Sequence, residues 1–254
     1  AALVEEDGGD PQSPRAHAEP DGDGFTIHGE RIAVPAADRA ARVLLAARLG
    51  AGVALFLVDP RSPGVTLERQ IATSGEPVFR LRLDGAHVPV DDLLAGPDRG
   101  AEVLAFLVER ATCALCALEL GVASRQLEMI SDYALRRSQF GKPIGLFQAV
   151  AQRAASAYID VLSIRLSMWQ AAFRIANDLP AAQPVAVAKF WASEAGHRVA
   201  AAAQHLHGGM GFDKGYPLYR YYLLAKQIEL SLGGAHAQLA RLGAMLAEEG
   251  AQPA

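Results

Sequence analysis

The chain has 254 residues, and its 24 Lys and Arg against 28 Asp and Glu give a formal net charge of −4. With 51% hydrophobic and 20% charged residues, the composition excludes a disordered or collagen-like chain. The sequence contains no uncharged apolar run long enough for a membrane-spanning helix. The near-neutral charge argues against nucleic-acid binding, because neutralising phosphates requires a basic surface.

The first 97 residues predict a β-rich domain. Short segments of strand-like composition or alternation are separated by Asp-Gly pairs that mark turns, and no helical pattern intervenes. This punctuation indicates a small antiparallel barrel or sandwich over residues 1–97. The segments are residues 25–32, 43–49 and 53–58 and the alternating Phe79, Leu81 and Leu83, and the turns are Asp21-Gly22, Asp23-Gly24 and Asp84-Gly85.

Residues 98–254 predict a helical domain. Asp98 is a suitable N-cap, and apolar residues then recur every three or four positions as far as Val122. Four long helices of low glycine content favour an antiparallel four-helix bundle, so the expected fold class is α+β. The later helices are expected at residues 146–176, 184–206, from 219 onward and, after Gly233-Gly234, at 236–249.

The two cysteines, Cys113 and Cys116, stand in an apolar helical stretch. A zinc or redox site would need a second ligand pair or an exposed helix start, so we expect two small buried residues. The low cysteine content fits a reducing compartment, and we expect a cytoplasmic protein. The N-terminus is acidic and lacks both a signal-peptide pattern and an initiator Met, so we expect the chain to begin within a longer gene product.

Three short segments carry the most specific patterns. In the first, residues 133–148, Gly and Pro end a helix, and Arg137 stands close in sequence to Gln and aromatic residues. The guanidinium of Arg137 offers a planar set of donors suited to a pyrophosphate. The second, residues 205–212, contains Gly208-Gly209, which can let a ligand approach the backbone. The third is Tyr216-Pro217 followed by Ala225-Lys226. Taken singly, the three also fit a polar helix corner, a helix C-cap and a turn before a helix.

In this order and spacing the segments resemble the acyl-CoA dehydrogenase family, and the resemblance extends over essentially the whole chain. The family patterns are R-x-Q-F-G-x-P-I-x-x-F-Q, A-S-E, H-G-G-x-G, Y-P and A-K. The corresponding residues here are Arg137, Gln139-Phe140-Gly141, Pro143-Ile144, Phe147-Gln148, Ala192-Ser193-Glu194, His207-Gly208-Gly209-Met210-Gly211, Tyr216-Pro217 and Ala225-Lys226. Segments such as Asp21-Gly22-Asp23-Gly24-Phe25 resemble the family's middle β domain, whereas the leading helical domain of the family has no counterpart in this chain.

The resemblance implies an FAD-dependent oxidoreductase that desaturates the Cα–Cβ bond of an acyl-CoA thioester and passes electrons to an electron-transfer flavoprotein or a similar acceptor. A glutamate removes the α-proton while the flavin accepts the β-hydride. Family members are usually dimers of dimers in which one subunit also contacts the adenosine and pyrophosphate of its neighbour's FAD. The residues that the resemblance assigns to this contact are Arg137, Gln139, Phe140, Phe147, Gln148, His207, Gly208 and Gly209.

The catalytic glutamate is missing at both places where the family carries it. Counted from Ala225-Lys226, the usual position falls on Leu232, which cannot accept a proton. A minority of the family places the base on an earlier helix, at positions that here are Thr112 and Ala111. Glu109 is two residues out of that register, so we interpret it as a solvated residue near a helix start and keep it as the weaker candidate base.

The residues that would hold this chain's own flavin ring also differ from the family. The family's W-[IV]-[ST] reads Ala33-Val34-Pro35 here, so the aromatic ring is lost and Pro35 has no N–H to offer. The family's T-E-P-x-A-G-S-D loop is shortened to residues 4–10, and the Gln before H-G-G is replaced by His205.

The losses are therefore on the subunit's own flavin site, whereas the residues donated to a neighbour are kept. This division predicts a non-catalytic subunit of a heteromeric acyl-CoA dehydrogenase whose partner brings the glutamate. By analogy with actinobacterial two-gene enzymes of lipid metabolism, the substrate would be a bulky CoA ester of steroid side-chain degradation. Two alternatives stay open: a self-sufficient dehydrogenase with a relocated base, and a flavin-free binding or scaffolding protein.

Overall fold

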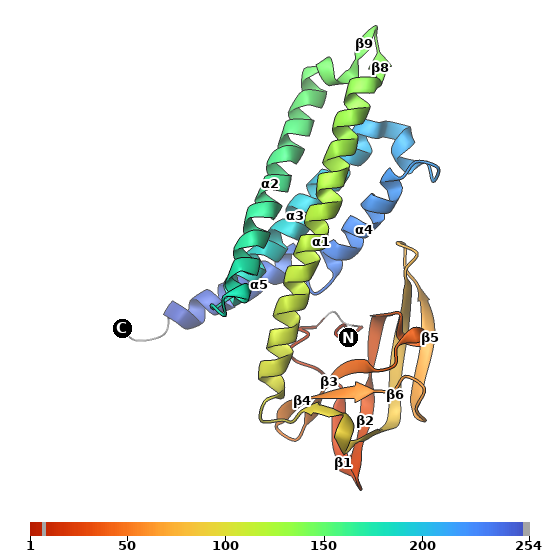
Figure 1. Ribbon diagram of the computed structural model, residues 1–254, viewed down its shortest axis with the longest axis vertical. Helices are drawn as coiled ribbons and strands as arrows, with labels where there is room; N and C mark the ends of the chain where they lie inside the picture. Colours follow the sequence, from red (N-terminus) through yellow and green to blue (C-terminus); the bar gives the residue numbers. More distant parts are fainter. Residues whose placement is uncertain (7–8, 251–254) are drawn as a thin grey trace. The chain divides into compact units, whose positions relative to one another are not determined.

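The computed structural model describes residues 1–6 and 9–250, and the chain divides into two compact units, Ala1–Val108 and Glu109–Ala254 (Figure 1). The first unit is built around a β-sheet and the second from helices, which confirms the predicted mixed α+β class. The boundary expected after residue 97 lies just before helix α1 (Gly100–Arg136), whose first turns belong to the first unit.

The first unit holds one seven-stranded sheet in the order β5-β6-β2-β1-β3-β4-β7. Neighbouring strands pair antiparallel except β1 and β3, which run parallel over two residue pairs. Because β5 and β7 lie at opposite ends of that order, the sheet is not closed, and the prediction of an antiparallel barrel was wrong in this respect. The strands are β1 (His17–Asp21), β2 (Gly24–Pro35), β3 (Val43–Leu49), β4 (Gly52–Val58), β5 (Val65–Ile71), β6 (Pro77–Pro89) and β7 (Leu93–Ala95).

The Asp-Gly pairs have two different roles. Asp21-Gly22 lies at the turn that joins β1 to β2, as predicted. Asp84-Gly85 instead lies inside β6, where the pairing with β2 shifts register between Ile27 and Gly29. Gly85 has φ 66°, the left-handed conformation that a β-bulge requires, so this pair bends a strand and does not reverse the chain.

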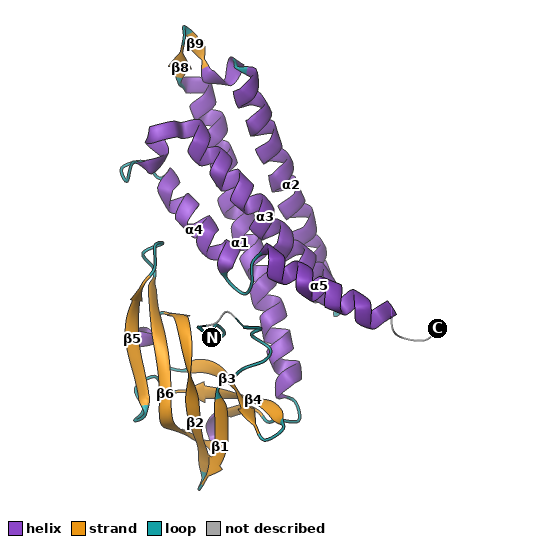
Figure 2. Cartoon of the chain, turned by 180° about the vertical axis from the view of Figure 1, so that it is seen from behind, coloured by secondary structure: helices purple, strands orange, loops and turns teal. Residues whose placement is uncertain are grey.

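The second unit contains five long helices among its described residues (Figure 2). Helix α3 contacts α2, α4 and α5, and the buried core of the unit draws on α1, α2, α3 and α4. Pro184 is accommodated in the first turn of α3, where its missing N–H has no intrahelical partner to lose. Besides α1, the helices are α2 (Gln148–Ala176), α3 (Ala182–His207), α4 (Leu218–Leu230) and α5 (Ala235–Gly250).

The cysteines lie where the sequence predicts. Cys113 and Cys116 are buried on α1 and not linked to each other, and burial raises the pKa of the Cys116 thiol to about 12. Both therefore act as small core residues. None of the helices in the described part of the chain is at once long and apolar enough to cross a bilayer.

Candidate functional site

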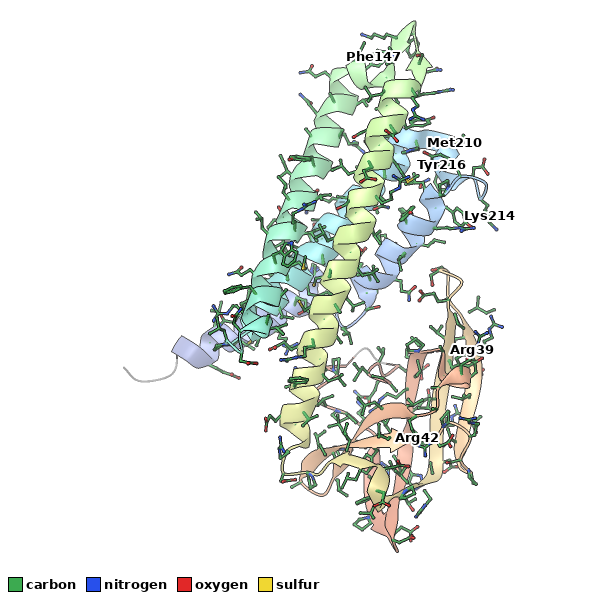
Figure 3. The ribbon with its side chains drawn as sticks, in the orientation of Figure 1. Arg39, Arg42, Phe147, Met210, Lys214 and Tyr216 are labelled. Atoms are coloured by element: carbon green, nitrogen blue, oxygen red, sulfur yellow. The ribbon has the colours of Figure 1, made fainter. Side chains whose placement is uncertain are left out.

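The three sequence segments come together in the helical unit through a stack of rings. The imidazole of His207, at the end of α3, lies 4.4 Å from the ring of Tyr133 on α1, measured between centroids. The imidazole also lies 5.4 Å from the ring of Tyr216, in the segment that leads into α4, with the two planes tilted by 42°. Phe147, Met210 and Tyr216 all lie toward the end of the unit that carries strands β8 (Ser138–Gln139) and β9 (Lys142–Pro143) (Figure 3).

His207 has both ring nitrogens occupied inside the protein. Its Nδ1–H donates to the carbonyl oxygen of Ala203 at 2.8 Å, and the hydroxyl of Tyr216 donates to its Nε2 at 3.2 Å. The side chain is buried, and this burial lowers its pKa, which favours the neutral ring that this bonding pattern needs. The imidazole thus orders the turn, and what the segment presents outward is the exposed backbone of Gly208 and Gly209.

Strands β8 and β9 form a small hairpin at the end of α1, which the sequence did not predict. Its two turn residues, Phe140 and Gly141, have φ 53° and 78°, as in a type I′ turn. The conformation is easy for Gly141 and strained for Phe140, whose ring is 93% exposed. A strained backbone and an exposed ring at Phe140 do not stabilise the fold, and they indicate that this surface contacts a ligand or another protein.

The hairpin is backed by Phe147. The rings of Phe140 and Phe147 meet edge to face with centroids 6.2 Å apart, and the ammonium of Lys142 lies 4.4 Å above the Phe147 ring. Gln148 starts α2 directly afterward and is exposed. Aromatic and amide side chains of the predicted segment therefore share one outward-facing surface.

Arg137 is held by its backbone and leaves its side chain free. Its N–H donates to the carbonyl oxygen of Tyr133 at 2.8 Å, and its own carbonyl oxygen accepts from the N–H of Ile144 at 2.8 Å. Within the described residues its exposed guanidinium makes no ion pair or hydrogen bond, whereas the Gln139 amide donates to the carbonyl oxygen of Ser138. A free guanidinium beside exposed glycine backbone and aromatic rings fits the phosphates and the base of a dinucleotide.

The β unit does not fit the other end of such a cofactor. At the positions that the resemblance assigns to contact with the flavin ring, Ala33 and Pro35 are exposed and Val34 between them is buried. The N–H of Ala33 donates to Oε1 of Gln70 at 2.8 Å and is already used, and Pro35 has no N–H. None of these three residues has an aromatic ring, and neither Ala33 nor Pro35 has a free backbone donor. In the shortened loop before them, Asp7 and Gly8 lie outside the described residues.

The positions for a catalytic base carry no usable carboxylate. Leu232 lies between α4 and α5 with φ 55°, and Thr112 is buried on α1 with Ala111 half-buried beside it. Glu109 lies in the third turn of α1, so its interpretation as a helix-start residue was wrong. Its carboxylate is only 22% exposed and lies 3.6 Å from the Arg110 guanidinium.

A buried carboxylic acid on α1, which faces α3, was not predicted from the sequence. Glu119 is fully buried, neither carboxylate oxygen has a hydrogen-bond partner among the described residues, and burial raises its pKa to about 8. A Cβ at Gly196 on α3 would lie 2.4 Å from Oε1 of Glu119, so only glycine leaves room for this side chain. Polar residues at a seven-residue spacing, Thr112, Glu119 and Gln126, are all buried on one face of α1. This seven-residue spacing of polar residues was the sequence signal that could have predicted a buried polar face.

Lys189 on α3 is another ionisable side chain in the interior of the helical unit. It is fully buried, and burial lowers its pKa to about 8. Its ammonium donates to Oγ of Ser193 and to the carbonyl oxygens of Ile228 and Glu229, the last residues but one or two of α4. Within the described residues no group of three His, Cys, Asp or Glu side chains could hold a metal ion.

Comparison with known proteins gives the same family for the helical part and for the whole chain. Residues 99–246 match the family described as acyl-CoA dehydrogenase, C-terminal domain. The chain is 43% identical over 235 residues to the acyl-CoA dehydrogenase FadE27 of Mycobacterium tuberculosis, covering 89% of this chain and 62% of that protein. It is also 29% identical over 239 residues to the bovine mitochondrial short-chain specific acyl-CoA dehydrogenase, of which it spans 58%.

Two solved structures are similar over nearly the full chain. One is the ChsE4–ChsE5 complex from Mycobacterium tuberculosis, with a TM-score of 0.90 and 43% identity, covering 100% of this chain and 66% of that chain. The other is a steroid ACAD, Tcur3481–Tcur3483, with a TM-score of 0.91 and 41% identity, covering 99% of this chain and 67% of that chain. With the motif residues, the fold and these relatives in agreement, the chain belongs to the acyl-CoA dehydrogenase family.

Proposed function

We propose that this chain is the non-catalytic subunit of a hetero-oligomeric, FAD-dependent acyl-CoA dehydrogenase and completes the flavin site of a neighbouring subunit. One observation carries the proposal. Most residues suited to a neighbour's dinucleotide are exposed, and the Arg137 guanidinium is free within the described residues, whereas the residues for the chain's own flavin ring and base are replaced, as at Pro35 and Leu232.

In the proposed enzyme the bound FAD supplies the hydride acceptor. The guanidinium of Arg137 and the exposed backbone of Gly208 and Gly209 bind the pyrophosphate that the neighbour's cofactor presents. Gln139, Phe140, Phe147 and Gln148 line the adenosine side, and His207 keeps the turn in place through Ala203 and Tyr216. Because Leu232 cannot take a proton, the α-proton of the substrate must be removed by a carboxylate of the partner subunit.

The surface of α2 supports a partner of this kind. Large apolar side chains along this helix are more than half exposed, a pattern that soluble monomers avoid. An open groove of about 830 Å³ lies between α2 and α3 beside them, with the ion pair of Asp160 and Arg198 in its lining. The exposed side chains are Tyr158, Ile159, Leu166, Trp169 and Phe173.

The substrate class follows from the relatives and from the family. An acyl-CoA thioester is the substrate of acyl-CoA dehydrogenases, and we propose a bulky steroid side-chain ester because a structure with 41% identity is described as a steroid ACAD. We propose an electron-transfer flavoprotein or a similar protein as the electron acceptor. The chain spans 62% of the length of the related FadE27.

Two other functions make different predictions. A self-sufficient dehydrogenase with Glu109 as a relocated base predicts bound flavin and turnover by the chain alone, but Glu109 already pairs with Arg110. A flavin-free scaffolding protein predicts neither flavin nor activity in any assembly, and it gives no reason for a strained, exposed Phe140.

Co-purification tests the proposal. The chain is isolated alone and together with the acyl-CoA dehydrogenase subunits of its native source, and flavin absorbance and acyl-CoA turnover are measured for each sample. We expect flavin and turnover only in a mixed assembly. Turnover by the chain alone would support the self-sufficient enzyme, and a colourless, inactive assembly with every subunit would support the scaffold.

A further inference from the structure

The loop between α4 and α5, Ser231–Gly234, is fixed from two sides by buried side chains. By resemblance to the family this loop is where active members carry their glutamate, and here it carries Leu232. If Leu232 had no role, we would expect the contacts that fix the backbone of this loop to be lost. The contacts are instead extensive.

Lys189 holds the end of α4 from within α3. An ammonium has three N–H donors, and here each has one acceptor: Oγ of Ser193 at 2.9 Å, the carbonyl oxygen of Ile228 at 2.9 Å and that of Glu229 at 3.1 Å. The last carbonyls of a helix lack intrahelical donors and form the negative end of its dipole, so a cation is favourable there. Ser193 adds a hydrogen bond from its hydroxyl to the carbonyl oxygen of Glu229 at 3.2 Å.

Gln238 holds the loop itself from α5. Its side-chain amide donates to the carbonyl oxygens of Leu232 at 2.9 Å and Gly233 at 3.3 Å, and the residue is 4% exposed. Leu232 has φ 55°, a left-handed conformation that a leucine adopts only when its surroundings impose it. The amide of Gln238 therefore meets the strained peptide directly.

We propose that Lys189 is the positioning residue of the α4–α5 loop, with Gln238 as its counterpart on the other side. The ammonium caps α4 and sets the path of Ser231–Gly234, so that Leu232 is kept at one place as an apolar surface where active relatives keep a base. The functional meaning of this placement rests on the proposed function. The clamp itself is a property of the isolated chain.

Glu119 is not part of the clamp. Its oxygens have no hydrogen-bond donor, whereas every acceptor of the Lys189 ammonium is a hydroxyl or carbonyl oxygen. Burial lowers the pKa of Lys189, and the weaker opposing effects come from Cys116 and Glu119 on α1 and from Glu229 on α4. Lys189 is thus held by directed hydrogen bonds to the loop end of α4 and not mainly by a counter-ion.

Hydrogen exchange of backbone amides in the chain as isolated tests the proposal. Lys189→Met removes all three donors and keeps an unbranched side chain. We expect the amides of Ser231 and Gln238, which donate to the carbonyl oxygens of Gln227 and Gly234, to exchange at least about tenfold faster, the factor that corresponds to loss of a charge-assisted hydrogen bond, while the amides of α2 stay as protected as before. Gln238→Met should accelerate the same amides.

Arg198→Met is the matched control. It removes a cation from the same helix, one that pairs with Asp160 on α2 and Glu194 on α3, and should leave the loop unchanged. Should Lys189→Met fail to fold, Ser193→Ala replaces it, because it removes one acceptor at little cost in volume, and the loop should again exchange faster than α2. Unchanged loop exchange, or equal acceleration throughout the unit, would overturn the proposal. A mixed assembly of this chain with its partner subunit that never binds flavin would contradict the proposed function and leave this measurement on the isolated chain intact.

Discussion

The imidazole of His207 lies on the ring of Tyr133, with centroids 4.4 Å apart and planes 27° apart. This contact joins the end of α3 to the end of α1, more than seventy positions earlier in the sequence. It brings the exposed glycines that follow His207 into one region with the β8–β9 hairpin, so a single cofactor can meet both segments.

Arg137→Ala should lower the FAD content of the assembled enzyme without unfolding it. The guanidinium is free within the described residues, so its loss removes a charge-assisted hydrogen bond to the cofactor and no internal contact. Such a bond contributes about 1.5–3 kcal/mol, or roughly ten- to a hundredfold in affinity. FAD occupancy at limiting FAD is the measurement, with the exposed Arg153 on α2, changed to Ala, as the control. Equal occupancy in both variants would refute the assignment of Arg137.

Because His207 is buried, we expect the free energy of unfolding to fall in acid. Burial lowers its pKa below the ordinary 6.5, so near that pH the unfolded chain binds a proton that the folded chain does not. Stability from this residue is therefore complete above pH 6.5 and is lost as the pH falls through that value. In His207→Gln the slope should be smaller by up to about 1.4 kcal/mol per pH unit. Urea unfolding between pH 5 and 7.5 measures it, and identical slopes would contradict the burial of a neutral imidazole.

Glu119 predicts the opposite dependence. Burial raises its pKa from 4.5 to about 8, so the folded chain keeps a proton that the unfolded chain releases between these values. Stability from Glu119 is therefore full below pH 4.5 and declines as the pH rises toward 8. Glu119→Gln should match the wild type at pH 4.5 and gain on it by up to about 1.4 kcal/mol per pH unit above that. A variant that is less stable at pH 8 would show that the carboxylate is ionised and paired.

Glu109→Gln should leave kcat of the assembled enzyme nearly unchanged. The carboxylate of Glu109 pairs with Arg110 on the same helix, and its loss removes one partly exposed ion pair, worth about 1 kcal/mol or less. Steady-state turnover of the mixed assembly is the readout. A fall of several orders of magnitude would make Glu109 the base and the chain a self-sufficient enzyme.

Local patterns predicted most of the fold. The runs at residues 43–49 and 53–58 became β3 and β4, and helix punctuation located α2 and α3 to within a few residues. The parallel pairing of β1 with β3 could not be predicted, because only two residue pairs specify it and β1 has just five residues. The Asp84-Gly85 bulge has the same local sequence as a turn, and only its pairing with β2 distinguishes the two.

The sequence motifs identified residues of the candidate site but not the contacts that these residues make. The sequence identified Arg137 and Gly208-Gly209 but could not show that the His207 ring is used internally, since that depends on Ala203 and Tyr216 being within reach. Lys189 was overlooked because a single lysine in a helical pattern usually faces solvent. Its burial requires three acceptors, one from α3 and two from α4, and no local pattern reports them.

In the proposed function, this chain completes a neighbour's flavin site and has no working flavin site of its own. The most direct test is to give the chain the missing base. Leu232→Glu in the isolated chain, with Leu232→Gln as the matched control, is assayed for bound flavin and for turnover with an artificial electron acceptor and a panel of acyl-CoAs. Because Ala33 has its N–H bonded to Gln70 and Pro35 has none, we predict no bound flavin and no turnover in either variant. Turnover with bound FAD in Leu232→Glu but not in Leu232→Gln would show an intact flavin site and contradict the account.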